Sequence, residues 1–240
     1  MNNGQRLGAL TRVVLDNPEL RDAYAALLSA IRLCLPFGSG KSILVTSTQP
    51  NEGKTTVATC LAIAASLSGQ DVLLIDGDLR RPSLTSAAGL PNGVGFGELL
   101  EGGTGIADAI YSVELPEDRR GAGSLSVMGA GGKSAEFLPG VDWSRARASF
   151  QAIAGRFALV LCDSPPILAA NDALLFAGMV DGVLLVVGAG SADRDEVRRA
   201  KEQLEPIGTP IIGAVLNQFD PKLHGRANKP YRGYNLDDRK

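Results

Sequence analysis

Residues 43–67 constrain the fold of this chain more than any other stretch. The apolar run Ile43–Val45 predicts a short strand, and residues 57–67 have the composition of a helix. The loop between them contains the run Gly53-Lys54-Thr55. A strand, a loop with Gly-Lys-Thr and a helix, in this order, are typical of a phosphate-binding P-loop.

Each residue type in this loop has a chemical reason to be there. Backbone N–H groups of the loop and the positive end of the following helix face an anion. Lys54 brings a positive charge to the terminal phosphates of a nucleotide, and the Thr55 hydroxyl can ligate Mg²⁺. Gly53 lets the backbone approach closely because it has no Cβ. The residues expected to surround the phosphates are Pro50, Asn51, Glu52, Gly53, Lys54, Thr55 and Thr56.

The loop departs from the standard P-loop pattern at one position. The first glycine of G-x-x-x-x-G-K-[ST] falls at Thr48. An ordinary strand-to-helix turn that happens to contain Gly-Lys is the alternative interpretation. The flanking strand and helix favour the phosphate site. A second Gly-Lys-Ser run, at residues 40–42, precedes the strand and is interpreted as a linker.

Composition narrows the class of protein. The chain has 240 residues, 45% of them hydrophobic, and a formal net charge of −2. These values suit one large globular domain and give no argument for nucleic acid as a partner. The three cysteines (Cys34, Cys60 and Cys162) lack metal-ligand spacing, and their odd number argues against a disulfide framework. No apolar run approaches the ~20 residues of a membrane span, and the N-terminus lacks a signal-peptide core. We therefore expect a cytoplasmic protein.

Carboxylates follow two further apolar runs. Residues 71–76 end in Asp76, with Asp78 two positions later, and residues 157–163 end in Asp163. Almost wholly apolar runs of this length indicate buried parallel strands, and open α/β sheets place their sites at the carboxyl ends of such strands. A simple Asp-Gly-Asp turn and a helix N-cap at Asp163 are the structural alternatives. The P-loop on a preceding strand favours a shared site.

The remaining pattern predicts a mostly parallel α/β sheet flanked by helices. We expect a flexible N-terminus (1–17), a P-loop domain (18–220) and a disordered tail (221–240) that contains Tyr231 and Tyr234. Residues 83–124 predict only short helices and loops. Further helices are expected at 18–31, 143–153, 171–178 and 193–204, and further strands at 125–128, 183–187 and 210–216.

Together these motifs resemble the bacterial tyrosine kinases (BY-kinases) of capsule and exopolysaccharide synthesis. Residues 50–56 resemble a deviant Walker A motif, residues 74–82 (Leu-Ile-Asp-Gly-Asp-Leu-Arg-Arg-Pro) the family's Walker A′, and residues 163–166 (Asp-Ser-Pro-Pro) its Walker B. The resemblance extends from about residue 17 to residue 234. It implies a P-loop NTPase fold and ATP-dependent phosphorylation of tyrosine.

The resemblance also implies roles for individual residues. Lys54 neutralises the phosphates of ATP, while Thr55, Asp78 and Asp163 hold Mg²⁺. Asp76 is the candidate to accept the tyrosine proton, which leaves the hydroxyl only near pH 10 without help; the roles of Asp76 and Asp78 are interchangeable at this stage. Asn217 is expected to contact the base of the nucleotide. Tyr231 and Tyr234 are the expected autophosphorylation sites.

The family relationship implies partners. It implies a transmembrane adaptor, a polysaccharide co-polymerase, which recruits the kinase to the inner face of the plasma membrane; because no span is evident here, the adaptor is expected on a separate chain. Self-association and tyrosine-containing substrate proteins are also implied. Several features depart from the family. Asn51 replaces a glycine, which alters the expected phosphate cradle, and Gly77 replaces an alanine, which is expected to be a mild change. The helix at 18–31 lacks both arginines of an E-x-x-R-x-x-R assembly motif, the segment 129–138 is shorter than the matching family loop, and the tail has only two tyrosines.

Two other functions are compatible with a P-loop. A partition or cell-division ATPase of the same superfamily would carry a signature lysine where Gln49 stands. A regulator that binds nucleotide without phosphorylating protein would need neither a catalytic base nor tail tyrosines. The run Arg80-Arg81-Pro82 favours the kinase over the partition ATPase.

Overall fold

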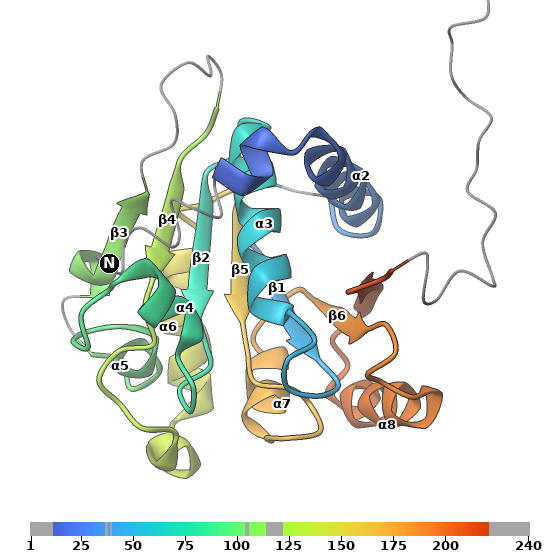
Figure 1. The fold of residues 1–240 in the computed structure, drawn as a ribbon. Helices are drawn as coiled ribbons and strands as arrows, with labels where there is room; N and C mark the ends of the chain where they lie inside the picture. The colour runs from blue at the N-terminus through green and yellow to red at the C-terminus, as the bar shows by residue number, and fades with distance from the viewer. Residues whose placement is uncertain (1–11, 37, 39, 104–105, 114–121, 221–240) are drawn as a thin grey trace, which may run out of the picture.

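A computed structural model describes residues 12–36, 38, 40–103, 106–113 and 122–220. Within these residues seven strands form one sheet in the order β3-β4-β2-β5-β1-β6-β7 (Figure 1). All neighbours pair in parallel except β3, which runs antiparallel to β4. The strands are β1 (Lys41–Ser47), β2 (Val72–Asp76), β3 (Ile110–Val113), β4 (Leu125–Met128), β5 (Leu159–Asp163), β6 (Gly182–Gly188) and β7 (Ile211–Asn217). The predicted mostly parallel α/β sheet is confirmed.

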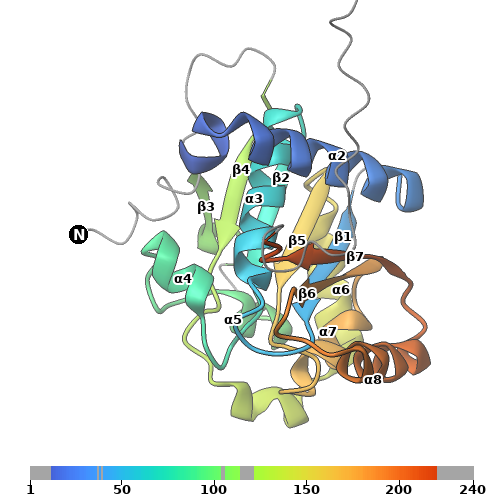
Figure 2. The same cartoon turned by 45° about the vertical axis from the view of Figure 1, so that its right-hand side comes forward.

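Helices cover both faces of the sheet. On one face lie α3 (Lys54–Leu67) and α2 (Pro18–Cys34), which packs across α3 (Figure 2). The other face is covered by α5 (Phe96–Leu100), α6 (Trp143–Ala154), α7 (Asp172–Ala177) and α8 (Arg194–Leu204). Short connecting helices are α4 (Ser83–Ala88) and the 3-10 turns η1 (Ile106–Ala109), η2 (Ala135–Gly140) and η3 (Glu205–Ile207).

Successive side chains of each strand point to opposite faces of the sheet, so the core has two layers. In β2, Leu73 and Ile75 pack with α5 and α6, whereas Val72 and Leu74 pack with α3. All four side chains are fully buried. A parallel strand covered on both faces must be apolar at every position, which explains the uninterrupted runs in the sequence. The register of the central strands also places Asp76 of β2 directly beside Asp163 of β5.

The N-terminal part is more ordered than expected. Residues 12–16, assigned above to a flexible N-terminus, are helical, and Val14 is fully buried in the same cluster as Leu28 of α2. The reason is tertiary packing, which a short polar-rich stretch does not reveal. Helix α2 begins as its sequence predicts, with Pro18 at its first position and the Asn17 side chain accepting a hydrogen bond from the Leu20 amide.

One strand was missed. Residues 83–124 were expected to contain only helices and loops, but Ile110–Val113 forms the edge strand β3. Four residues, three of them half-buried and Ser112 exposed, form too short a pattern to identify a strand. The expected tail at 221–240, with Tyr231 and Tyr234, lies outside the described residues. In the part of the chain that the structure describes, none of the helices combines the length and apolarity needed to cross a membrane.

Helix α2 offers a test of whether it is a fixed part of this domain. Leu28 is 3% exposed, whereas Leu33 of the same helix is 87% exposed. We expect Leu28→Ala to lower the free energy of unfolding by about 2–4 kcal/mol through lost burial and a cavity. Leu33→Ala should change it by less than roughly 0.5 kcal/mol. Urea denaturation of both variants makes the comparison. If Leu28→Ala lowers the free energy of unfolding no more than Leu33→Ala does, α2 does not stabilise the domain.

Candidate nucleotide and phosphoryl-transfer site

A cavity of about 320 Å³ opens at the carboxyl ends of the central strands. Its walls come from three segments that are distant in sequence: the P-loop, the loop after β2 and the loop after β5. The structure thus brings together the three motifs that the sequence singled out. The lining residues are Pro50, Asn51, Lys54, Asp78, Arg80, Arg81, Ser83, Pro165, Pro166, Ala169 and Ala170.

The backbone of the P-loop adopts two left-handed conformations. Gly53, the N-cap of α3, has φ 85°, and a Cβ there would collide with the side-chain amide of Asn217. Asn51 has φ 68°. Asparagine tolerates this region better than other residues with a side chain. The substitution of the family's glycine by Asn51 is therefore compatible with the conformation of the loop.

Glu52 is directed into the protein rather than toward the phosphates. Its carboxylate, 1% exposed, accepts hydrogen bonds from the Thr48 hydroxyl (2.8 Å), the Gln49 amide (2.8 Å) and the Gly188 amide at the end of β6 (3.0 Å). One buried carboxylate thus joins the two ends of the loop and ties them to a neighbouring strand. Glu52, one of the residues expected to surround the phosphates, thus supports the loop through its side chain.

Two amides from the end of β7 hold the same loop. The Asn217 side chain donates to the Glu52 carbonyl and the Gln218 side chain to the Asn51 carbonyl, both at 2.8 Å. The sequence predicted that Asn217 contacts the base. In the structure its amide nitrogen supports the P-loop, and contact with a base stays a prediction.

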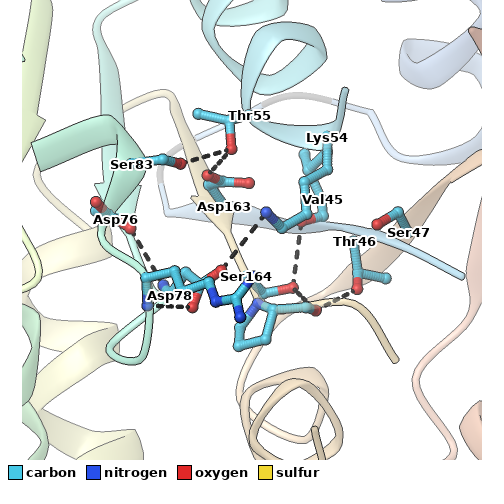
Figure 3. Close-up of polar contacts among 12 residues, drawn as sticks. Val45, Thr46, Ser47, Lys54, Thr55, Asp76, Asp78, Ser83, Asp163 and Ser164 are labelled. Atoms are coloured by element: carbon cyan, nitrogen blue, oxygen red, sulfur yellow. Dashed lines mark hydrogen bonds and ion pairs between the residues drawn. The ribbon is translucent and has the colours of Figure 1, made fainter. Parts of the chain in front are cut away.

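Lysine and carboxylates meet at the floor of the cavity (Figure 3). Lys54 Nζ lies 3.5 Å from Asp78 Oδ2, with only 14% and 6% of the two side chains exposed. The Thr55 hydroxyl donates to Asp163 Oδ2 at 2.6 Å and lies 3.2 Å from the Ser83 hydroxyl. Lys54, Thr55, Asp78 and Asp163 thus form one cluster, in agreement with the pattern of the sequence.

Asp163 carries the observation that best fits a metal ion. Its Oδ1 atom is buried and has no hydrogen-bond partner among the described residues. Burial raises the pKa of Asp163 to about 7, although Lys54 and the Thr55 hydroxyl lower it. A cation beside Oδ1 would satisfy this atom and stabilise the charged form.

The donor set suits Mg²⁺ in particular. Thr55, Asp78 and Asp163 offer oxygen atoms, and Mg²⁺ is usually bound by one or two carboxylates together with substrate phosphates. Among residues that the structure describes, no group of three or more His, Cys, Asp or Glu side chains could hold a metal alone. The oxygen donors present fit an Mg²⁺ ion that shares its coordination with the phosphates of a nucleotide.

Asp76 lies beneath the cavity rather than on its wall. Its Oδ2 accepts hydrogen bonds from the amide and the hydroxyl of Thr85, both at 2.7 Å, and its Oδ1 accepts from the Asp78 amide at 3.2 Å. Burial raises the pKa of Asp76 to about 6, and these hydrogen bonds oppose the rise. In this conformation Asp76 organises the loop after β2, and Asp78 is the carboxylate of the pair that faces the cavity.

The loop after β2 has two further fixed points. Arg80 forms a bidentate ion pair with the buried Asp172 of α7, at 2.6 and 3.0 Å. Gly77, expected to be a mild change from alanine, is tightly enclosed: a Cβ would lie 2.7 Å from the Asp163 carbonyl oxygen and 2.9 Å from Cys162 Sγ. The geometry corrects that expectation, since alanine would require a shift of the β5 backbone.

Sequence reasoning missed three contributors to this site. Ser83 and Thr85 lie in an uninformative Ser/Thr/Ala-rich segment, and Asp172 was interpreted only as the start of a helix. Their partners are 28, 9 and 92 residues away in the chain, respectively. Only the fold reveals such contacts, and no local signal in the sequence identifies them.

Comparison with known proteins supports the same assignment. Residues 43–232 match the family model of the CobQ/CobB/MinD/ParA nucleotide binding domain. The chain is 31% identical to the tyrosine-protein kinase YwqD of Bacillus subtilis over 223 residues, which cover 90% of this chain and 89% of that protein.

Solved structures show which of two related groups of proteins this chain resembles more. The kinase domain of Escherichia coli tyrosine kinase ETK has a TM-score of 0.76 at 28% identity, covering 93% of this chain and 84% of that one. The cell division ATPase MinD of Pyrococcus furiosus has a TM-score of 0.59 at 25% identity, covering 74% and 71%. The fold is common to both groups, and the kinase domain is the more similar.

The role of Glu52 can be tested by a neutral substitution. In Glu52→Gln the side-chain NH₂ would face hydrogen-bond donors in place of an acceptor. We expect a loss of about 2–3 kcal/mol of unfolding free energy and at least roughly tenfold weaker binding of a non-hydrolysable ATP analogue, measured by denaturation and calorimetry. Glu202→Gln, on an exposed face of α8, is the matched control. Unchanged nucleotide affinity in Glu52→Gln would refute the supporting role.

Asp163 predicts a pH dependence of stability. In the unfolded chain this carboxyl ionises near pH ~4, whereas in the folded protein burial raises its pKa to about 7. Between these values the folded state binds the proton that the unfolded state has lost. The corresponding stability is complete below the unfolded pKa and is lost as the pH rises through about 7.

The melting temperature of the metal-free protein should therefore fall between about pH 5 and about pH 8. In Asp163→Asn, which has no proton to lose at this position, the fall should be smaller, and the variant should be the more stable protein at the upper pH. Thermal melts of both proteins across this range make the measurement. Parallel pH profiles would contradict the assigned pKa.

Proposed function

Because this chain belongs to the CobQ/CobB/MinD/ParA nucleotide-binding family and, within it, to the bacterial tyrosine-protein kinases, we propose that it transfers phosphate from ATP to tyrosine. Its own tail residues Tyr231 and Tyr234 are the proposed acceptors. The proposed biological role is control of capsule or exopolysaccharide polymerisation and export.

The observation that carries the proposal is a cluster of one lysine, one threonine and two carboxylates, of which Lys54 and Asp78 line the cavity and Thr55 and Asp163 lie behind them. Lys54 and Thr55 come from the P-loop, Asp78 from the loop after β2, and Asp163 from the end of β5. Phosphoryl transfer depends mainly on positioning and charge stabilisation. The cluster offers a cation for the phosphates and a carboxylate for the acceptor, within reach of solvent.

In the proposed reaction the tyrosine oxygen bonds to the γ-phosphorus of ATP while the bond to the β–γ bridging oxygen breaks, and ADP leaves. Lys54 and the loop amides stabilise the charge on the phosphates. Mg²⁺, held by Thr55, Asp78 and Asp163, would neutralise charge on the phosphate oxygens.

The tyrosine proton passes to a carboxylate in this reaction. Asp78 is the proposed acceptor because it lies on the cavity wall, although in this arrangement it also serves the metal. Burial raises the pKa of Asp76, the first candidate from the sequence, to about 6, which suits a general base. It would have to release the Thr85 hydroxyl to act as the base.

The proposal includes partners. A membrane adaptor of the polysaccharide co-polymerase type would recruit and activate the kinase at the cytoplasmic face of the plasma membrane. Self-association would bring the tail of one copy to the cavity of another. Loss of the assembly-motif arginines from α2 means that other contacts would have to support this association.

A partition ATPase is the weaker candidate. Its signature lysine would occupy the position of Gln49, and the Gln49 side chain is engaged within its own chain, donating to Glu196 of α8 at 2.9 Å. The lower similarity to MinD points the same way. Intact Lys54 and carboxylates oppose a regulator without catalytic activity.

A phosphorylation assay tests the proposed function. The full chain is incubated with ATP and Mg²⁺, with and without the cytoplasmic peptide of an adaptor. Mass spectrometry should find phosphate on Tyr231 and Tyr234, and none on Tyr24, which is only 9% exposed. Lys54→Met should reduce the signal at least roughly a hundredfold, because it removes the cation that stabilises the transferred phosphate. ATP hydrolysis without phosphotyrosine, even with the adaptor peptide, would refute the kinase.

A further inference from the structure

A second cavity adjoins the nucleotide cavity. It has a volume of about 580 Å³ and lies between η2, α6, α7 and α8. The two cavities share Arg80, Ala169 and Ala170 as lining residues, so they are contiguous. The reaction proposed above uses none of the second cavity's other residues.

The chemistry of this second cavity is that of a site for a cationic side chain. Trp143, at the first position of α6, supplies a half-buried aromatic surface. Three charged residues line the cavity. Arg80 and Asp172 neutralise each other in their bidentate pair. Glu136 is exposed on η2, and its carboxylate makes no hydrogen bond or ion pair among the described residues, although its charge helps to raise the pKa of Arg80, whose main partner is Asp172. An aromatic surface beside an unpaired carboxylate favours a lysine or an arginine.

The tail sequence provides such a side chain next to each tyrosine. Residues 229–231 are Lys-Pro-Tyr and residues 232–234 are Arg-Gly-Tyr. In both cases a cation stands two positions before the tyrosine, separated from it by one proline or glycine. In an extended segment, residues two apart point to the same side and lie roughly 7 Å from each other. A tyrosine at the nucleotide cavity would then present its cation to the adjoining one.

We propose that the cavity lined by Glu136 and Trp143 binds the cationic residue two positions before the acceptor tyrosine, in the tail of a second copy of this chain. This proposal rests on the proposed kinase function. It names the substrate class as tyrosine preceded at that distance by lysine or arginine. Glu136 is the specificity-determining residue, and Arg80, held by Asp172, lies between the two subsites.

Trp143 provides a direct test because it is the single tryptophan of the chain. The full protein, without nucleotide, is titrated with an acetylated peptide of residues 227–236. Tryptophan fluorescence should change and saturate. A peptide with Lys229→Ala and Arg232→Ala should bind about tenfold more weakly. This measurement needs no phosphate transfer.

Steady-state phosphorylation of the same peptides then separates binding from chemistry. For the native protein, loss of the two cations should raise KM about tenfold and leave kcat within about twofold. Glu136→Lys should reverse the preference, phosphorylating a peptide with Lys229→Glu and Arg232→Glu better than the native peptide. Glu19→Lys, the same charge reversal at an exposed position on the opposite layer, should leave the native preference unchanged.

The outcomes distinguish this proposal from the function on which it rests. If no phosphotyrosine forms but fluorescence still shows binding that depends on the cations and on Glu136, the kinase function fails and the cation subsite stands. If phosphotyrosine forms while all peptides have the same KM and Glu136→Lys changes nothing, the subsite is refuted. If the rate per molecule does not depend on protein concentration, the tail is supplied by the same copy and the second-copy part is refuted.

Discussion

The site depends first on one carboxylate, that of Glu52, which is buried within the protein. Glu52 accepts hydrogen bonds from Thr48 and Gln49 at the start of the P-loop and from Gly188 at the end of β6. Asn51 and Gly53, on either side of it, have left-handed backbone conformations, and its carboxylate is buried. The loop expected to bind phosphate is therefore held in shape by an internal anion, the Glu52 carboxylate, which accepts hydrogen bonds from two backbone amides and one hydroxyl of the protein.

The register of neighbouring strands brings carboxylates of the active site close together. Asp76 and Asp163 end adjacent parallel strands and face each other in the ladder. Burial is the main cause of the raised pKa of both carboxyls; the charge of Asp78 adds to it at Asp76, and the charges of Asp76 and Asp78 add to it at Asp163. Lys54 and the Thr55 hydroxyl offset part of this cost. Because buried negative charge is unfavourable by itself, this site favours the binding of a cation, and of phosphates that bring the cation with them.

Sequence predicted those parts of the molecule that local pattern determines. Apolar runs identified the central strands because both faces of the sheet are covered, and the Gly53-Lys54-Thr55 run identified the phosphate site. The edge strand β3, the burial of Val14 and the inward direction of Glu52 depend on contacts with distant residues. The same holds for Asp76, whose oxygen atoms are occupied by Thr85 nine positions later. Motif spacing places a residue at a site but does not give the direction of its side chain.

The Arg80–Asp172 pair has a consequence beyond holding the loop after β2. Arg80 lines both of the contiguous cavities, Asp172 lines only the second, and half of the Arg80 side chain is exposed. A ligand that draws the guanidinium toward the phosphates must change the shape of the other cavity. Thermodynamic linkage then requires that occupation of that cavity change the affinity for the nucleotide by the same factor. Binding of the substrate and binding of the nucleotide would therefore be coupled through the position of the Arg80 side chain, and each would change the affinity for the other.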